Sequence, residues 1–169
     1  MRPHYAGISF IILALASPGI GSSTENIWFK LEAGDGQSFT APKDLIGTRT
    51  VCLYETRETK GVNEAFKDWI RDLHKSSESP AFSILAVADT TEAIAPIRGI
   101  WRRALVKESQ EIGYTLWGDW DGRMRGFYSP AKGQANTLVL DRDASLLWKK
   151  VGPLSPEDFA HIKALLIQD

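Results

Sequence analysis

Hydrophobic and polar positions along this chain follow two periods, one typical of strands and one typical of helices. Residues 27–33 (IWFKLEA) nearly alternate and precede a Gly-Asp-Gly turn, which predicts a first strand. Residues 50–54 (TVCLY) are β-branched, aromatic or apolar, as a buried strand requires. After a polar loop, apolar residues recur at helical spacing and predict a helix over 62–74: Val62, Phe66, Trp69, Ile70 and Leu73.

The middle of the chain adds a buried strand and a second helix. The unbroken apolar run at 82–88 (FSILAVA) is typical of a parallel strand that is covered on both faces. Helical spacing predicts a helix over 97–111, which Gly113 terminates. A short strand at 114–117 and a loop with one helical turn at 119–130 follow. The stripe of the second helix comprises Ile100, Trp101, Ala104 and Leu105.

The last part of the chain predicts a hairpin and a capped helix. Residues 137–140 (TLVL) and 146–151 (LLWKKV) flank a turn-rich segment. Ser155, Pro156 and the two acids after them have the order of an N-cap, a first helical residue and a first turn. Strands that alternate with helices and end in a hairpin predict an α/β fold, with helices covering both faces of a mixed central sheet.

Composition indicates one globular domain and argues against a nucleic-acid partner. The chain has 169 residues, of which 43% are hydrophobic and 24% charged, as is ordinary for a folded domain. The formal net charge is -1, whereas nucleic-acid binders usually carry a basic stripe. After the N-terminal segment no apolar run approaches the roughly 20 residues that span a bilayer, so no membrane span is expected in the mature protein.

The N-terminal segment has the layout of a secretory signal. Arg2 precedes an apolar run at 8–16 (ISFIILALA), which ends in an Ala-Leu-Ala cleavage pattern. We therefore expect a signal peptide over 1–22, cleaved between about 16 and 22, and a single domain over 23–169. Such a protein is periplasmic or otherwise exported.

Cys52 is the sole cysteine, so no intramolecular disulfide can form. Its place inside a predicted strand favours a small buried apolar side chain. The alternative is a one-cysteine thiol oxidoreductase or peroxidase, which requires an exposed thiolate with a lowered pKa. Neither a metal nor a cofactor is expected, because the histidines do not cluster and Asp119 and Asp121 lack the further acids of a calcium loop.

Three segments resemble the thioredoxin-like superfamily: TVCLYETRETKGVNEAF at 50–66, ANTLVLD at 135–141 and LLWKKVGPLSPEDF at 146–159. Within that superfamily, the run from 139 to 159 is most similar to the YtfJ-type exported bacterial proteins. The resemblance implies a three-layer α/β/α sandwich with a mixed central sheet and a C-terminal β-hairpin plus helix.

The chain departs from the superfamily at the positions that carry its chemistry. A redox-active member has Cys-x-x-Cys where this chain has Thr59, Lys60, Gly61 and Val62. It also has a cis-proline where this chain has Ala135. The usual thiol-disulfide chemistry is therefore not implied by the resemblance.

One candidate binding site is the loop at 55–61, because open α/β sheets bind ligands at the carboxyl ends of their strands. Thr59, Lys60 and the start of the following helix would hold an anion or a carboxylate. The alternative is a solvated loop in which Thr59 caps the helix. The binding residues expected at this sheet end are Glu55, Arg57, Glu58, Thr59, Lys60, Asp89, Gln134 and Asn136.

A second candidate is an aromatic and arginine-rich group, in which Trp117, Trp120, Phe127 and Tyr128 cluster around Arg123 and Arg125. Protein-binding surfaces are enriched in these residue types, although aromatic residues also pack beneath irregular loops. Three functional hypotheses remain. The first is a non-catalytic binding or accessory protein of the bacterial cell envelope, with an unknown protein or small ligand as partner. The others are the one-cysteine enzyme and a structural subunit of an envelope assembly.

Overall fold

One mixed sheet organises residues 27–76 and 81–167, which are the residues that the computed structural model describes. The expected signal peptide lies outside them. The strand order is β2-β1-β5-β4-β3-β6-β7, with β3, β4 and β5 parallel and the other pairs antiparallel. The strands are β1 (Phe29–Ala33), β2 (Ser38–Ala41), β3 (Arg49–Glu55), β4 (Phe82–Asp89), β5 (Leu116–Asp119), β6 (Asn136–Leu140) and β7 (Leu146–Val151).

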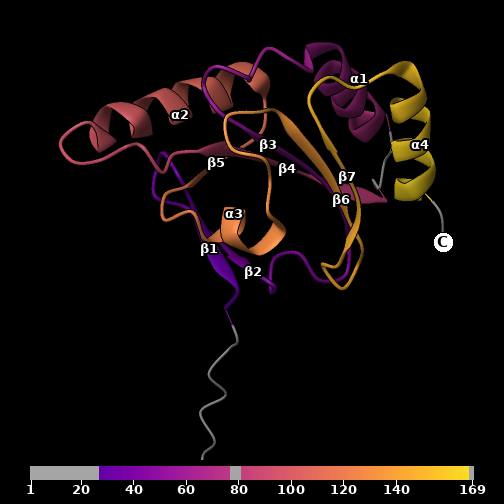
Figure 1. Ribbon diagram of the computed structural model, residues 1–169, viewed down its shortest axis with the longest axis horizontal. Coiled ribbons are helices and arrows are strands. Elements are labelled where there is room, and N and C mark those ends of the chain that lie inside the picture. Colours follow the sequence, from indigo (N-terminus) through magenta and orange to yellow (C-terminus); the bar gives the residue numbers. More distant parts are fainter. Residues whose placement is uncertain (1–26, 77–80, 168–169) are drawn as a thin grey trace, which may run out of the picture.

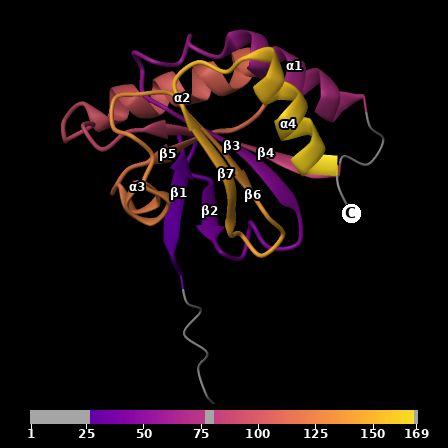
Figure 2. The ribbon, with the colours of Figure 1, turned by 45° about the vertical axis from the view of Figure 1, so that its right-hand side comes forward.

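The helices divide unequally between the two faces of the sheet. α1 (Glu64–Lys75), α2 (Arg98–Ile112) and α4 (Pro156–Ile167) cover one face, and the short α3 (Arg123–Tyr128) covers the other (Figures 1 and 2). The connections β3–α1–β4 and β4–α2–β5 both step across the sheet in the same direction. Because such crossovers are right-handed, α1 and α2 must lie on the same face. The predicted α/β sandwich with a mixed sheet is confirmed.

Alternating side chains of the central strands build two cores. On the face of α1 and α4, Val51 and Leu53 pack with Phe66 and Ile70. On the opposite face, Cys52 and Tyr54 pack with residues of β1 and α3. All of these side chains are almost fully buried. Neighbouring residues of β3 therefore face different environments, which decides below what each of them can do.

The structure corrects four local predictions. β2 was not predicted, because a four-residue edge strand carries too short a pattern to recognise. α1 begins at Glu64 rather than at 62, since 57–63 forms turns. The first strand is shorter than predicted, whereas the helical turn expected within 119–130 is present as α3. In α2 only Leu105 of the predicted stripe is buried.

None of the described helices is long and apolar enough to cross a bilayer. The C-terminal hairpin and the last helix lie where they were predicted, and helix α4 starts at Pro156. Its first turn is held by Asp158, whose carboxylate accepts hydrogen bonds from the Ser155 backbone N–H (2.7 Å) and from Lys150 Nζ (2.6 Å). This capping explains why the sequence signal at the last helix was reliable.

Candidate ligand-binding site

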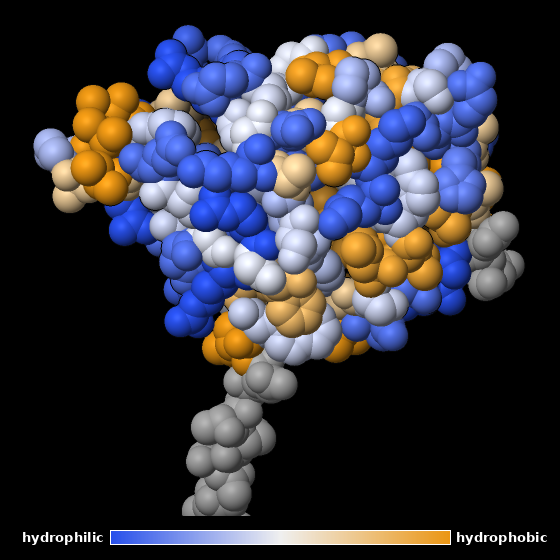
Figure 3. Space-filling view, viewed as in Figure 1, coloured by the Kyte–Doolittle hydropathy of each residue, from blue (hydrophilic) through white to orange (hydrophobic). Residues whose placement is uncertain are grey.

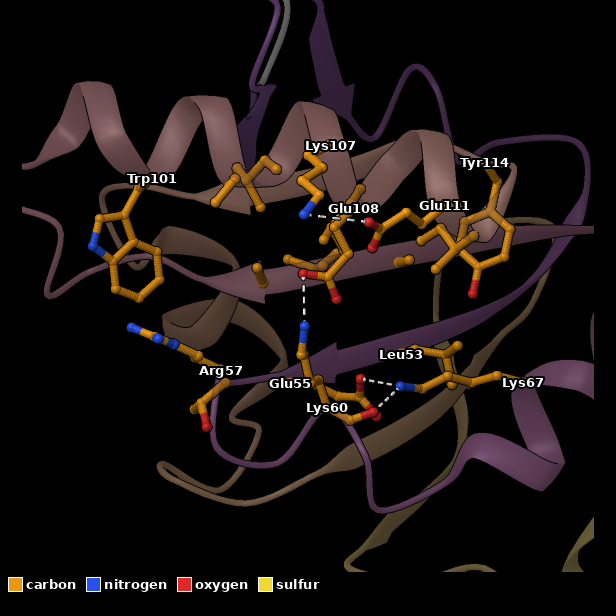
Figure 4. Close-up of a pocket in the computed structure, with 18 of the residues that line it drawn as sticks. Leu53, Glu55, Arg57, Lys60, Lys67, Trp101, Lys107, Glu108, Glu111 and Tyr114 are labelled. Atoms are coloured by element: carbon orange, nitrogen blue, oxygen red, sulfur yellow. Dashed lines mark hydrogen bonds and ion pairs between the residues drawn. The ribbon is translucent and has the colours of Figure 1, made fainter.

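A cavity of about 420 Å³ opens between α1 and α2, above β3, β4 and β5 (Figure 4). Its floor is apolar and includes Leu53, Ala86 and Leu116, one residue from each parallel strand. Its walls are mostly charged side chains from α2 and from the loop before α1. An apolar floor with a few polar groups at the rim is typical of small-molecule sites of this volume. We call this cavity the α1–α2 pocket.

The pocket exists because α2 is held away from the centre of the sheet. Residue 34 lies directly under α2, and any β-carbon there would collide with the carbonyl oxygen of Arg102, so glycine is required for this close approach. Arg102 also pairs with Glu32 of β1 at 2.5 Å, which fixes α2 over that strand. Above β4 the side chains of Ala86 and Ala88 are too small to fill the remaining space.

An ion pair with two carboxylates lies at the α1 side of the pocket. Lys67 Nζ lies 2.8 Å from Glu55 Oε2 and 3.1 Å from Glu64 Oε1, and it also donates a hydrogen bond to the carbonyl oxygen of Lys60. Glu55 and Lys67 are both nearly buried, with side chains 12% and 11% exposed. Glu55 Oε1 is buried and has no hydrogen-bond partner among the described residues. A buried carboxylate oxygen without a donor is unusual and marks a place where a donor would be stabilising.

The pKa values of this group follow from burial. Burial raises the pKa of Glu55, and the hydrogen bond and charge of Lys67 offset part of that effect. For Lys67 burial acts to lower the pKa, but the bonds and charges of Glu55 and Glu64 together outweigh it and raise the value. Burial also raises the pKa of Tyr114 at the same end of the pocket. Such perturbed groups in a cavity are typical of functional sites.

Two further ion pairs line the pocket. Lys60 Nζ lies 3.2 Å from Glu108 Oε2 and joins the loop before α1 to α2, and Lys107 pairs with Glu111 along α2 at 3.6 Å. In Figure 4, Trp101 and Arg57 lie towards one end of the pocket, and Tyr114 and Lys67 lie towards the other. Each end of the pocket thus combines an aromatic ring with a basic side chain.

Cys52 has no access to this pocket. Its side chain is fully buried on the α3 face of the sheet, whereas the neighbouring Leu53 faces the pocket. Burial raises the pKa of the Cys52 thiol, and the charges of Glu55 and Asp119 raise it further. The thiol therefore stays protonated and inaccessible, which is the opposite of what a reactive cysteine requires.

The loop before α1 is arranged differently from either prediction made for it. Thr59 does not cap the helix: its hydroxyl accepts a hydrogen bond from the Thr56 backbone N–H at 2.9 Å. Asn63 occupies the N-cap position, but its side chain bonds Leu154 N (2.9 Å) and Gly152 O (3.2 Å) instead. Of the binding residues predicted in this loop, three line the pocket: Glu55, Arg57 and Lys60. Glu58, Gly61 and Val62 are exposed and do not line it.

A second group of polar side chains lies at the carboxyl edge of the sheet, on the α3 face. Tyr54 Oη donates to Asp119 Oδ2 at 3.0 Å, and the same carboxylate accepts the backbone N–H groups of Met124 and Arg125 at the start of α3. Arg125 pairs with Asp89 at 2.9 Å. Burial raises the pKa of Asp119, while these donated hydrogen bonds act to lower it. The group is internally satisfied and positions α3.

The predicted aromatic and arginine-rich group does not form one exposed surface. Trp117 packs against Phe39, with ring centroids 5.5 Å apart. Trp120 donates to the carbonyl oxygen of Glu32 at 2.8 Å and lies beneath two arginines of α2. Arg123 is exposed beside Asp121. Since most of these side chains bind within the chain, the structure gives little support to an assembly surface here.

The remaining predicted residues lie before and at the start of β6. Asn136 is buried, and its side-chain amide bonds the backbone of Ala131 and the carbonyl oxygen of Gln134, which itself is exposed. Ala135 is buried, and its carbonyl oxygen accepts a hydrogen bond from the Gly152 N–H at 2.7 Å. Within the described ranges, no group of three or more potential ligands is placed to hold a metal ion.

Sequence reasoning missed the half of the pocket that α2 and its neighbours contribute. Trp101, Glu108 and Tyr114 line the pocket, and Lys67 reaches into it from α1. One signal was available: the alanines at 86 and 88 share a strand face with no large neighbour between them. Because the position of α2 depends on tertiary contacts, that signal alone was not enough to predict a cavity.

Comparison with known proteins gives a fold and no closer relationship. No protein-family profile matches the sequence, and no curated protein matches it. Solved structures do match. The exposed lipoprotein thioredoxin Etrx1 of Streptococcus pneumoniae is similar with a TM-score of 0.62 and 12% identity, over 80% of this chain and 97% of that one. StoA of Bacillus subtilis is similar with a TM-score of 0.57 and 12% identity, over 80% and 95%.

A third similar structure is a thiol:disulfide interchange protein DsbE from Chlorobium tepidum. It has a TM-score of 0.59 and 18% identity, over 80% of this chain and 87% of that one. At these identities the likeness establishes architecture alone. The likeness extends over 80% of this chain in each case, and the chain accordingly has a thioredoxin-like fold.

Proposed function

We propose that this chain is a non-catalytic binding protein of the bacterial cell envelope, which holds a small organic ligand in the α1–α2 pocket. The observation that carries the proposal is an open cavity with an apolar floor and no thiol on its walls. Cys52 supports it, because that thiol is buried on the other face of the sheet. Export is supported by the apolar run at 8–16 after Arg2.

We further propose that the chain is most similar in kind to the YtfJ-type exported proteins. The support is the run VLDRDASLLWKKVGPLSPEDF at 139–159, which spans β7 and the capped start of α4. The expected mature protein begins between about 16 and 22. Mass measurement of the protein recovered from the periplasm tests that part directly.

The absence of thiol chemistry is tested with Cys52. In the folded protein the thiol should not react with an aromatic disulfide reagent, and it should react at once after unfolding. The folded protein should also reduce neither a protein disulfide nor a peroxide. Turnover that disappears in Cys52→Ser would overturn the non-catalytic proposal.

The binding role is tested by screening small organic fragments against the folded protein with NMR. Amide shifts should concentrate around Leu53, Ala86 and Leu105. A matched control is Ala104→Trp, which places a large side chain at an exposed position of α2 that lines the pocket. It should keep the fold and lose the shifts. Fragments that bind only outside the pocket would contradict the proposed function.

A further inference from the structure

The hydrogen-bonding capacity of the pocket indicates which ligand class it suits, given the proposed function. An ammonium group has three N–H donors. Those of Lys67 are all used, by Glu55 Oε2, Glu64 Oε1 and the carbonyl oxygen of Lys60. The most deeply placed cation of the pocket therefore has no donor left for an anionic ligand. The unused capacity there is an acceptor, the buried Oε1 of Glu55.

The charged side chains of the pocket differ in how far they are buried. The lining has five basic and four acidic side chains, so the total alone favours neither sign of ligand. The carboxylates of Glu55 and Glu108 are 12% and 29% exposed, whereas Lys60 and Lys107 are 54% and 79% exposed. Glu64 and Glu111 are 64% and 61% exposed, and Arg71 is 27% exposed, so Glu55 and Glu108 are the two more buried acids of the lining. The acceptor left without a partner is Oε1 of Glu55. Interior charges act more strongly because they are screened less.

Lys60 places a weakly held, half-exposed cation beside these two carboxylates. Its backbone carbonyl and Glu55 bind the same Lys67 ammonium, so Lys60 lies next to Glu55. Its own ammonium crosses to α2 and pairs with Glu108 at 3.2 Å (Figure 4). A half-exposed ion pair between long side chains contributes little to stability. Lys60 can therefore turn out to solvent at small cost.

We propose that the α1–α2 pocket binds a small amphipathic amine, whose ammonium group displaces that of Lys60 and bonds both Glu108 and the unpaired Oε1 of Glu55. The displacement of Lys60 opens the way to Oε1, which is covered in the unliganded pocket. The apolar part of the ligand lies on Leu53 and Ala86 and extends towards Trp101.

The direct test compares three probes of one shape in NMR titrations of the folded protein: 2-phenylethylamine, 2-phenylethanol and phenylacetate. The amine should bind in the millimolar range or better. The alcohol and the carboxylate should bind at least about tenfold more weakly, since an unscreened charged hydrogen bond is commonly worth that factor or more. All three should shift the same pocket residues if they bind.

Variants identify the groups involved. Glu55→Gln and Glu108→Gln should each weaken amine binding by about tenfold. Glu108 is partly exposed on α2, so Glu108→Gln should fold. It keeps the test decisive if Glu55→Gln fails to fold. Lys60→Gln should strengthen amine binding several-fold, because it removes the competing cation. Glu58→Gln is the matched control, because it removes an exposed carboxylate of the same loop that does not line the pocket, and it should have no effect.

The outcomes separate this inference from the proposed function. Binding of the alcohol as tightly as the amine would overturn the inference and keep a binding role for the pocket. A preference for phenylacetate that Arg57→Gln abolishes would do the same and assign the pocket to anions. Failure of all three probes and of the fragment screen would overturn both. Unchanged amine affinity in Lys60→Gln would refute the displacement step.

Discussion

The helical layer on one face of the sheet has two halves that differ in packing. We call the region between α1 and α4 the packed half and the region between α1 and α2 the open half. Between α1 and α4, the rings of Phe66, Trp69 and Phe159 pack with centroids 5.0 to 5.6 Å apart, over the side chains of β3 and β6. Between α1 and α2, the sheet presents Ala86 and Ala88, and a cavity of about 420 Å³ remains. Large aromatic side chains fill the space in the first region, whereas small alanine side chains leave space for a ligand in the second.

The surfaces of the two halves differ as well. Beside the packed half, Leu146, Leu147 and Val151 of β7 are exposed. Beside the open half, Ile94, Ile97 and Ile100 are exposed around the start of α2, where apolar residues gather in Figure 3. Ile100 also lines the pocket. The apolar side chains of α2 therefore lie mostly at the pocket or on the surface beside it, rather than in the core.

The largest expected effect is the loss of an aromatic side chain from the packed half. Phe66→Ala removes a fully buried ring that contacts two others, and it should lower the free energy of unfolding by about 3–5 kcal/mol. Trp101→Ala, in the wall of the open half, should cost less than about 1 kcal/mol. Urea denaturation of both variants measures this contrast. Equal losses would mean that α2 is as tightly packed as α4.

The next effect concerns the buried ion pair of the open half. Lys67→Met leaves the Glu55 carboxylate buried without its cation, and it should cost about 3 kcal/mol of unfolding free energy. Glu55→Gln introduced into the same variant should recover part of the loss, because the unpaired charge is then gone. Lys107→Met removes an exposed pair on α2 and should change stability by less than about 0.5 kcal/mol. A small effect of Lys67→Met would show that water or a neighbour replaces its bond.

A larger side chain should affect stability differently in the two halves. Val139→Leu adds a methylene to a fully buried position of the packed half, and it should destabilise by about 1–2 kcal/mol. Ala88→Leu extends into the pocket and should change stability by less than about 1 kcal/mol, because space is available. Thermal and urea unfolding report both values. Marked destabilisation by Ala88→Leu would argue that the pocket closes in solution.

The smallest expected effect is a difference in pH dependence. The pKa of Glu55 in the folded state lies above its ordinary 4.5, because burial disfavours the carboxylate. Just above pH 4.5 the folded state then holds more protons than the unfolded state, and stability falls as pH rises. The pKa of Asp158 in the packed half is lowered, first by its hydrogen bond with Lys150. Its contribution is present above 3.8 and is lost as pH falls below that value.

Unfolding free energies measured across pH 3 to 7 test the direction of both pH dependences, with one variant for each carboxyl group. Glu55→Gln should flatten the decline of stability above pH 4.5, and Asp158→Asn should flatten the loss at acid pH. Each variant should leave the other limb of the profile unchanged, because the two carboxyl groups share no partner among the bonds described for them. A steeper decline above pH 4.5 in Glu55→Gln would reverse the assignment for Glu55.

Much of the fold was determined by the sequence itself. The central strands, the terminal hairpin and α4 are marked by local signals: apolar runs, turn residues, and a serine followed by proline and acids. The burial of Cys52 follows from its place in such a run. These features depend on periodicity and on capping within a few residues, and a sequence records that kind of information directly.

The pocket was decided by tertiary structure alone. Glu55, Arg57 and Lys60 were recognisable as residues at a sheet end, but their partners Lys67, Glu108 and Trp101 come from two helices. Asp89, Trp120 and Asn136, predicted as binding residues, instead form contacts within the chain. Whether a polar side chain meets a ligand or another part of the chain depends on how the helices pack over the sheet. Here the glycine beneath α2 and the alanines of β4 set that packing.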